Sequence, residues 1–209
     1  MSARKTAAPS AKPAKPAIQK TVKPHGGAGE VRIVGGQWKR TPLPVSDRPG
    51  LRPTPARVRE TLFNWLGQDL SGWRCIDAFA GSGALGMECA SRGAAQVLLC
   101  DQDPELVIAL KKVCTRLGAG NVEVRRGDGI TALRTVPGTW DLVLIDPPFE
   151  AGLFDAALAA GAGALTPNGR LYMEAPEAWD ESRLLDLGWK LERHLRAGVV
   201  HAHLLSRSA

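Results

Sequence analysis

The chain has 209 residues, 44% of them hydrophobic, and a net charge of +6. This length fits one domain of ordinary size plus an extension, with enough apolar residues for a substantial core. The sequence has no run of about 18 apolar residues and no apolar stretch after its basic N-terminus, which argues against a membrane span and a secretory signal, so we expect a cytoplasmic protein.

Residues 1–29 are rich in alanine, lysine and proline, with six basic and no acidic residues. Such a segment buries too little apolar surface to fold, so we predict a disordered basic tail, with a transit peptide as a minor alternative. The first 60 residues carry a net charge of +10 and the remaining 149 carry −4. Basic charge confined to an N-terminal module indicates anion binding there, although the charge of the tail alone could serve solubility.

Residues 30–52 form a second segment, which we expect to be a small hairpin extension. Val31–Val34 and Gln37–Arg40 flank the pair Gly35-Gly36, a pattern that predicts two short strands around a glycine turn. An extended stretch, Thr41–Val45, follows. We assign 53–209 to the main domain.

A helix is predicted to begin after residue 53. Thr54 followed by Pro55 has the pattern of an N-cap with proline at the first helical position. Arg57 and Arg59 are expected to project away from the apolar face of this helix. That face repeats at helical spacing and consists of Val58, Leu62, Trp65 and Leu66.

From residue 72 the chain alternates short apolar strands with helical segments. The strands are expected at Arg74–Asp77, Gln96–Cys100, Val122–Arg126, Asp141–Ile145 and Arg170–Glu174. The helices are expected at 84–92, 104–117, 129–135, 152–163 and 177–186. This alternation predicts an α/β protein with a doubly wound, mostly parallel sheet, which a C-terminal antiparallel hairpin, Lys190–Arg196 and Val199–Leu205, extends to seven strands.

The first strand of this sheet leads into a glycine-rich loop. The loop runs from Asp77 to Gly86, with glycines at 81, 83 and 86, so the backbone can turn tightly and a ligand can approach it. The G-x-G-x-x-G spacing alone also matches dinucleotide sites. An acid four residues before the first glycine, where those sites have an apolar residue, and the longer loop favour S-adenosylmethionine over a nicotinamide cofactor.

Aspartates follow several of the predicted strands. Asp77, Asp101, Asp128 and Asp146 each come at a strand end. Ligands of doubly wound sheets bind at the carboxyl ends of the strands, so these four side chains are expected in one crevice. Asp101 lies where a carboxylate accepts both ribose hydroxyls, with Asp103 as a competing candidate. A lone aspartate after a strand is often only a helix cap, but four in register with a glycine loop favour a site.

The turn Asp146-Pro147-Pro148-Phe149 ends an apolar strand, because proline cannot continue a sheet ladder. It combines a carboxylate, two backbone carbonyls and an aromatic ring. Asp146 and the Pro147 carbonyl could each accept a hydrogen bond from one N–H group of an exocyclic amine. This would orient the nitrogen lone pair toward a methyl donor, and Asp146 could take up the released proton. Phe149 would stack on the base, or else pack into the core as part of a structural turn.

Histidine and cysteine give no pattern of a metal site. His201 and His203 share one face of a predicted strand, but without a third ligand nearby we expect solvated edge residues. The four cysteines form no C-x-x-C pair, and we expect reduced, buried thiols.

Taken together, these motifs resemble those of the RsmD family of bacterial 16S rRNA guanine-N2 methyltransferases. The resemblance covers roughly residues 30–206. It rests on Arg32–Trp38, Leu51–Thr54, Arg57–Leu66, Asp77–Gly83 and Asp146–Phe149. It implies a class I methyltransferase (Rossmann-like) fold, S-adenosylmethionine as donor, and guanine 966 of 16S rRNA in the small ribosomal subunit as target. The tail at 1–29 is not part of the family pattern.

The resemblance also implies roles for individual residues. Asp77, Gly81 and Gly83 would line the cofactor, Asp101 its ribose and Asp128 its adenine. Asp146, Pro147 and Phe149 would handle the guanine. Four further residues are expected at the cofactor: Thr54, Phe79, Ala80 and Ser82. The expected RNA contacts are Arg32, Trp38, Lys39, Arg40, Arg52, Arg57 and Arg59, although Trp38 could equally clamp the domain edge. We expect a monomer that needs no metal.

Three rival functions stay open. A DNA adenine-N6 or cytosine-N4 methyltransferase uses the same kind of turn, but it normally carries a target-recognition domain for which this chain has no room. A nicotinamide-dependent oxidoreductase is disfavoured by Asp77. A non-catalytic RNA-binding assembly factor could have kept the fold, and loss of methylation but not of RNA binding in Asp146→Ala would discriminate it from an enzyme.

Overall fold

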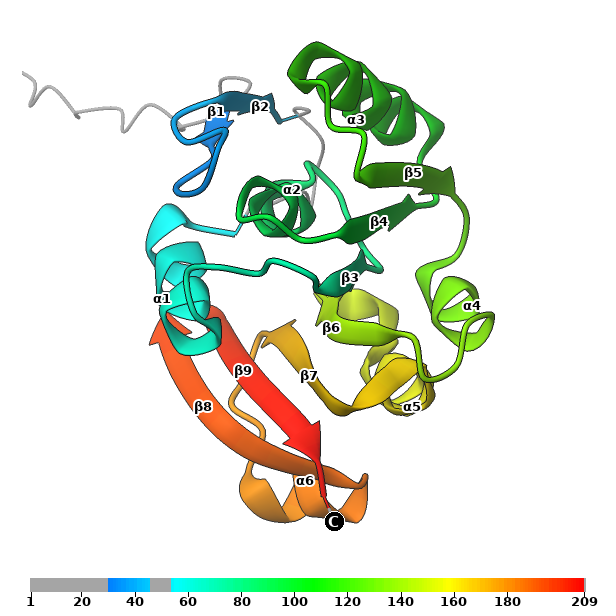
Figure 1. Cartoon of the computed structure of the whole chain (residues 1–209). Coiled ribbons are helices and arrows are strands. Elements are labelled where there is room, and N and C mark those ends of the chain that lie inside the picture. Colours follow the sequence, from blue (N-terminus) through cyan, green and yellow to red (C-terminus); the bar gives the residue numbers. More distant parts are fainter. Residues whose placement is uncertain (1–29, 46–53, 209) are drawn as a thin grey trace, which may run out of the picture.

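The computed structural model describes residues 30–45 and 54–208 (Figure 1). The predicted tail at 1–29, the domain boundary predicted at 52 and the predicted RNA contact Arg52 lie outside the described residues. Two sheets are present in the described part: a small antiparallel pair, β1 (Glu30–Arg32) with β2 (Pro42–Pro44), and a large sheet of seven strands.

The large sheet has the strand order β5-β4-β3-β6-β7-β9-β8. Its strands are β3 (Arg74–Asp77), β4 (Gln96–Asp101), β5 (Val122–Arg126), β6 (Trp140–Ile145), β7 (Leu165–Ala175), β8 (Trp189–Ala197) and β9 (Val200–Arg207). The first five are parallel, whereas β9 runs antiparallel between β7 and β8. The doubly wound sheet and the C-terminal hairpin are therefore confirmed.

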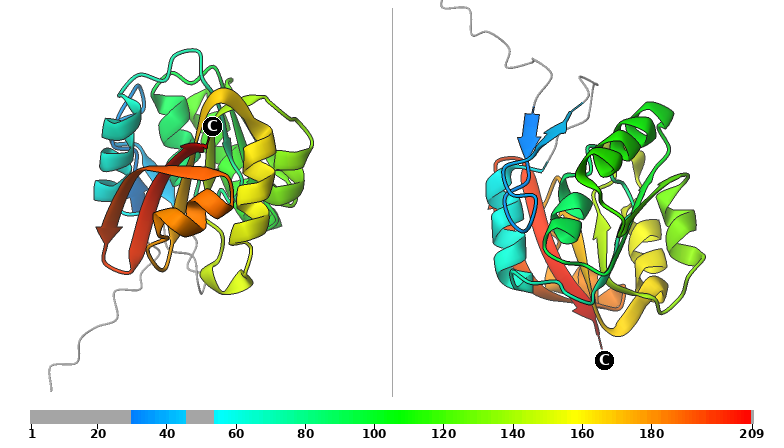
Figure 2. Two further views of the ribbon diagram at one scale, coloured as in Figure 1. Left: turned by 90° about the horizontal axis from the view of Figure 1, so that it is seen from below. Right: turned by 45° about the horizontal axis from the view of Figure 1, so that its top comes forward.

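Helices cover both faces of this sheet, as Figures 1 and 2 show. One face packs against α1 (Ala56–Leu66), α2 (Ala84–Ser91) and α3 (Pro104–Leu117). The other packs against α4 (Gly129–Arg134), α5 (Phe154–Ala164) and α6 (Glu181–Asp186). A one-turn helix, η1 (Phe149–Ala151), follows β6. Two hydrophobic cores result, one on each face of the sheet, and the sheet lies between the two helix layers.

The predicted starts of two helices are wrong. Pro55 rather than Thr54 is the N-cap residue of α1, and no side chain caps this helix. The Thr54 hydroxyl hydrogen-bonds the Glu174 carboxylate instead, which explains why it does not cap. The last helix begins at Glu181 rather than at 177, because Asp180 accepts a hydrogen bond from the Arg183 backbone N–H at 2.7 Å and starts the helix there.

The prediction for the N-terminal hairpin is also wrong in its second strand. Residues 37–40 form a turn, and the strand that pairs with β1 is β2. The turn is held by α2, since the Trp38 backbone N–H donates to Ser91 Oγ at 2.9 Å. Gly36 has a φ of 72°, and a Cβ on it would overlap the Ser91 backbone carbonyl. Contacts with α2, which a local pattern does not reveal, therefore set the length of this turn.

Four cysteines are free thiols, three of them buried and Cys114 half-buried. Among the described residues, no helix combines the length and apolarity that crossing a bilayer requires.

Candidate active site

Three carboxylates lie at the carboxyl ends of adjacent strands, on the sheet face that α1 and α2 cover. Asp77 ends β3 and pairs in register with Leu144 of β6. Leu144 pairs in turn with Tyr172 of β7. Alternate residues of a strand share a face, so Asp146 and Glu174, two residues beyond this pair, lie on the same face as Asp77. The structure therefore brings the predicted residues Asp77 and Asp146 together.

The glycine loop fixes Asp77 beneath the start of α2. Its Oδ2 accepts a hydrogen bond from the Gly86 backbone N–H at 3.0 Å. A Cβ on Gly86 would overlap the Leu99 side chain, so only glycine allows α2 to approach the strands this closely. Gly83, with a φ of 76°, makes the left-handed turn into the helix. Ala80 and Ser82 are buried in this loop, and Phe79 is half-buried.

Asp77 is 2% exposed, and burial raises its pKa to about 7. The nearby charges of Asp101 and Glu174 contribute to this rise, whereas backbone hydrogen bonds from Gly86 and Phe79 oppose it. No ion pair among the described residues includes Asp77. A buried carboxyl group of this kind would be stabilised in its charged form by a cationic ligand group, such as the ammonium of an amino acid.

Asp101 and Asp103 have different roles in the structure. Asp101 Oδ2 accepts from the Gly81 backbone N–H at 2.8 Å and therefore holds the glycine loop against β4. Asp103 caps α3, because its Oδ1 accepts from the Glu105 backbone N–H at 2.8 Å. Asp101 is thus the carboxylate at the loop and Asp103 a helix cap, while a role of Asp101 at the ribose hydroxyls stays a prediction.

Asp128 is both a helix cap and a strand-end residue. Its Oδ1 accepts from the backbone N–H and the hydroxyl of Thr131, at 2.7 and 2.8 Å, and caps α4. Gln102 donates to Oδ2 at 3.1 Å. These hydrogen bonds, from Thr131 first, lower the pKa of Asp128. Capping of α4 is reason enough for an aspartate at this position, and a role of Asp128 at an adenine ring stays a prediction.

The Asp146-Pro147-Pro148-Phe149 turn opens toward solvent. Asp146 is half-buried, Pro147 is buried and the Phe149 ring is 36% exposed. Phe149 contacts Phe154 with its ring centroid 6.4 Å away. It is therefore a partly open ring surface that leans on Phe154, not a core residue. Burial raises the pKa of Asp146 well above its usual range, and the charges of Glu174 and Asp77 add to the rise.

Sequence reasoning missed Glu174. This carboxylate is 2% exposed, accepts a hydrogen bond from the Tyr172 hydroxyl at 2.8 Å and contacts the hydroxyl of Thr54. Burial raises its pKa, while these hydrogen bonds and the charge of Arg59 oppose the rise. An acid inside the otherwise apolar run Leu171–Ala175 was the available signal. Thr54, predicted at the cofactor, lies against this residue, and its contact with the cofactor stays a prediction.

The predicted RNA contacts divide into two groups. Arg32, Lys39 and Arg40 are exposed on the hairpin and its turn, and Arg57 is exposed on α1. Trp38 is half-buried and packs on the core, so it clamps the edge of the domain.

Arg59 was wrongly predicted as a surface contact. It is 1% exposed, and its guanidinium donates to Glu88 Oε1 at 3.0 Å and to the Thr54 carbonyl at 3.1 Å. Helical spacing correctly placed Arg59 outside the apolar face of α1, but α2 covers this other side of the helix and buries Arg59 there.

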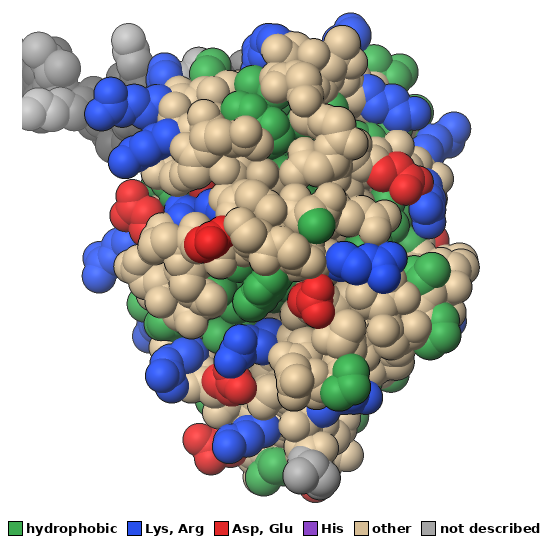
Figure 3. Space-filling model, in the orientation of Figure 1, with side chains coloured by type: hydrophobic (Ala, Val, Ile, Leu, Met, Phe, Trp, Pro, Cys, Tyr) green, Lys and Arg blue, Asp and Glu red, His purple; other side chains and the backbone are tan. Residues whose placement is uncertain are grey.

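Basic residues of α3 extend the exposed basic surface, which the charge count had placed in the first 60 residues. Lys111, Lys112 and Arg116 are exposed, and Arg116 donates to the Pro42 carbonyl at 2.8 Å, which ties α3 to the hairpin. Blue side chains border the upper part of the molecule in Figure 3, over the hairpin and α3. We call Arg32, Lys39, Arg40, Lys111, Lys112 and Arg116 the basic surface.

The prediction of solvated edge histidines is wrong for His203. This ring is fully buried, and its Nε2 accepts a hydrogen bond from the Trp179 backbone N–H at 3.1 Å. His194 and His201 stack beside it on the same face. No group of side chains in the described residues could hold a metal ion.

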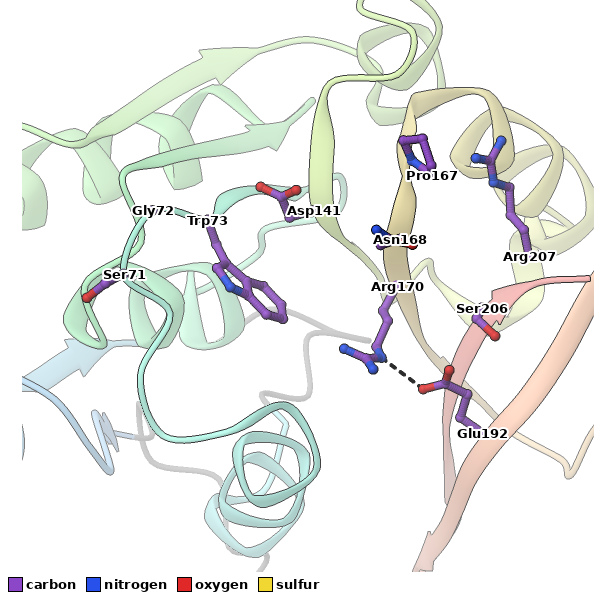
Figure 4. Close-up of a pocket in the computed structure, with 11 residues that line it drawn as sticks. Ser71, Gly72, Trp73, Asp141, Pro167, Asn168, Arg170, Glu192, Ser206 and Arg207 are labelled. Carbon is purple, nitrogen blue, oxygen red and sulfur yellow. Dashed lines mark hydrogen bonds and ion pairs between the residues drawn. The ribbon is translucent and has the colours of Figure 1, made fainter.

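A large hollow of about 750 Å³ lies at the opposite end of the sheet. Figure 4 shows Trp73, Asp141 and Asn168 around it, with the Arg170–Glu192 ion pair at 2.9 Å across one side. Trp73 directly precedes β3, Asp141, Asn168 and Arg170 lie toward the amino ends of β6 and β7, and Glu192 lies near the start of β8. Because ligands of such sheets bind at the carboxyl ends, we do not assign the reaction to this hollow.

Comparison with known proteins agrees with this geometry. A family model described as Conserved hypothetical protein 95 matches residues 31–206. Ribosomal RNA small subunit methyltransferase D of Escherichia coli is 41% identical over 187 residues, which are 88% of this chain and 94% of that protein. The chain belongs to the RsmD family. The protein of the same name from Haemophilus influenzae is 35% identical, over 88% of this chain and 98% of its own length.

The structural match for this RsmD-family protein is equally extensive. The solved structure of yhhF from Escherichia coli aligns with a TM-score of 0.73 at 40% identity, and the alignment covers 87% of this chain and 99% of that one. The strand order and these matches give the class I methyltransferase fold. Fold and family together make the chain a methyltransferase.

Proposed function

We propose that this protein transfers a methyl group from S-adenosylmethionine to the exocyclic N2 of guanine 966 in 16S rRNA of the small ribosomal subunit. The observation that carries the proposal is the half-buried Asp146, which shares its turn with the exposed Phe149 ring and feels the charge of the buried Asp77 of the glycine loop. The family relatives named ribosomal RNA small subunit methyltransferase D support the substrate.

The residues at the glycine loop fit an S-adenosylmethionine donor. The buried Asp77 carboxyl group suits the ammonium of the amino-acid part, and Asp101 and Asp128 suit the ribose hydroxyls and the adenine. Phe79, Ala80, Ser82 and the glycines 81 and 83 supply close-packed loop backbone. When bound, this donor supplies a methyl group on a sulfonium, which needs no acid to activate it.

The catalytic turn supplies acceptors for the amine of the target base. Its nitrogen is a poor nucleophile because the lone pair is delocalised into the ring. Asp146 and the Pro147 carbonyl accept hydrogen bonds from its two N–H groups and orient the lone pair outward, while Phe149 stacks on the base. The raised pKa of Asp146 makes its carboxylate a better acceptor for the proton that N2 loses.

The basic surface provides a place for rRNA phosphates. Its lysines and arginines come from two elements, the hairpin and α3, that Arg116 joins through the Pro42 carbonyl. Phosphate contacts position a nucleic acid without reading its sequence, so choice of the nucleotide depends on the pocket at Asp146 and on the shape of the RNA. A protein that methylates ribosomal subunits would act in the cytoplasm, and this is the location that we propose.

The experiment that tests this function is methyl transfer to purified small subunits. Subunits from a strain that lacks the gene are incubated with the protein and labelled S-adenosylmethionine, and the labelled nucleoside is identified by mass spectrometry. We expect N2-methylguanosine at one position of 16S rRNA. Label in N6-methyladenosine, in DNA or in no nucleic acid would contradict the proposal.

A further inference from the structure

Glu174 is a buried acid that the mechanism above does not use. β6 ends at Ile145, which pairs with Met173 of β7, so Asp146 directly follows the last paired residue of β6 and Glu174 is the next residue of β7. Neighbouring strands lie about 4.8 Å apart, so the two residues are close neighbours, and the charge of Glu174 acts on Asp146. Two carboxyl groups at this spacing in a buried site do not both ionise freely, because like charges repel.

Hydroxyl donors hold Glu174 in one orientation. Tyr172 donates to its Oε1 at 2.8 Å, and the Thr54 hydroxyl is a second partner. Arg59 acts on Glu174 from α1 as a positive charge, and Asp77 acts on Asp146 from β3 as a negative one. These donors and the nearby cation favour the charged form of Glu174 against the burial that raises its pKa, and in that form its negative charge acts on Asp146.

We propose that Glu174 is a positioning residue of the methyl transfer reaction, which pairs with Asp146 and strengthens that carboxylate as a proton acceptor. The inference rests on the proposed function. In the reaction, N2 of the base forms a bond to the methyl carbon, the carbon–sulfur bond of the sulfonium donor breaks with its electron pair staying on sulfur, and one proton leaves N2 for Asp146. Glu174 touches neither substrate and acts only through Asp146.

The test is the pH profile of methyl transfer with Glu174→Gln. Rates with rRNA are measured at saturating S-adenosylmethionine, so that titration of Asp77 does not enter. Activity rises with pH as Asp146 ionises. Loss of the Glu174 charge lowers the pKa of Asp146, and we expect the rising limb to move to lower pH by about one unit. Tyr172→Phe, which removes a donor from Glu174, should move it in the same direction by less.

A spectroscopic measurement is independent of activity. The ¹³C signal of the Asp146 carboxyl group should titrate at lower pH in Glu174→Gln than in the wild type. Glu123→Gln, an exposed change on β5, is the matched control and should leave both profiles in place. The inference would be overturned if Glu174→Gln is folded and both the rising limb of its pH profile and the titration of the Asp146 carboxyl group lie at the same pH as in the wild type. A wild type that transfers no methyl group would instead contradict the proposed function.

Discussion

At the scale of single residues, the buried carboxyl group of Asp77 makes donor binding depend on pH. Its pKa is raised to about 7, so near neutral pH it is partly protonated. An ammonium group bound beside it lowers that pKa, and the proton is released. Affinity for S-adenosylmethionine should therefore rise as pH increases toward 7 and then level off.

Calorimetric titration in two buffers of different ionisation enthalpy measures this proton release. In Asp77→Asn the release should vanish, and binding should weaken by at least about tenfold, or about 1.4 kcal/mol. Asp186→Asn, an exposed change on α6, is the control. Equal proton release in wild type and Asp77→Asn would assign the titration to another group.

The buried His203 ring gives a second pH effect, this time on stability. Burial lowers its pKa from 6.5 to about 4. The unfolded chain therefore binds more protons between these values, and stability falls as pH drops from about 6.5 to about 4, by up to about 3 kcal/mol. Urea unfolding at pH 7 and pH 4.5 measures the loss. His203→Gln keeps an acceptor for the Trp179 N–H without titrating, so this variant should lose less stability between the two pH values than the wild type. An equal loss of stability in both proteins would contradict the assignment to His203.

At the scale of elements, Glu88 of α2 fastens the hairpin and α1 to the main sheet. This buried carboxylate pairs with Arg59 at 3.0 Å and with Arg92 at 3.2 Å, and it accepts the Val34 backbone N–H. Glu88→Ala leaves two buried guanidinium groups without their partner, which costs about 3 to 5 kcal/mol. Urea unfolding measures this loss, with Glu60→Ala on the exposed side of α1 as control. A loss near zero would mean that the network is solvated.

The sequence predicted most elements of the main sheet, because each strand and helix has its own apolar period and the glycines and prolines mark the ends. β3 and α3 begin and end where the sequence predicts. The predictions fail where contacts with elements distant in the sequence determine the local structure. Ser91 of α2 determines the hairpin turn, and α2 buries Arg59 on a side that helical spacing left open.

The candidate site follows the same division. Asp77, Asp101 and Asp146 could be found because strand ends of a parallel sheet converge, a rule that needs only the element order. Glu174 was marked only as an acid in an apolar run, since its place in the site depends on the register of β7 against β6 and on its hydrogen bond with Thr54. Sequence patterns locate the candidate site at the strand ends, whereas the packing decides which side chains meet there.

At the scale of the whole molecule, the basic surface lies over the hairpin and α3, on a different set of elements from the catalytic turn. Lys111→Gln with Lys112→Gln should weaken rRNA binding and lower the slope of log K against log salt by about 0.7 to 0.9 for each phosphate that these lysines neutralise. Filter binding at several salt concentrations measures the slope. Lys190→Gln on β8 is the control, and an unchanged slope in the double variant would remove α3 from the RNA surface.

The central claim is that Asp146 acts in the methyl transfer and not in holding the RNA. The most direct measurement compares Asp146→Ala with the wild type for methylation of small subunits and for rRNA binding, with Asp155→Ala on α5 as control. We predict that methylation falls by at least about a hundredfold while the binding affinity stays within about twofold. Methylation near the wild-type rate in Asp146→Ala would contradict the account.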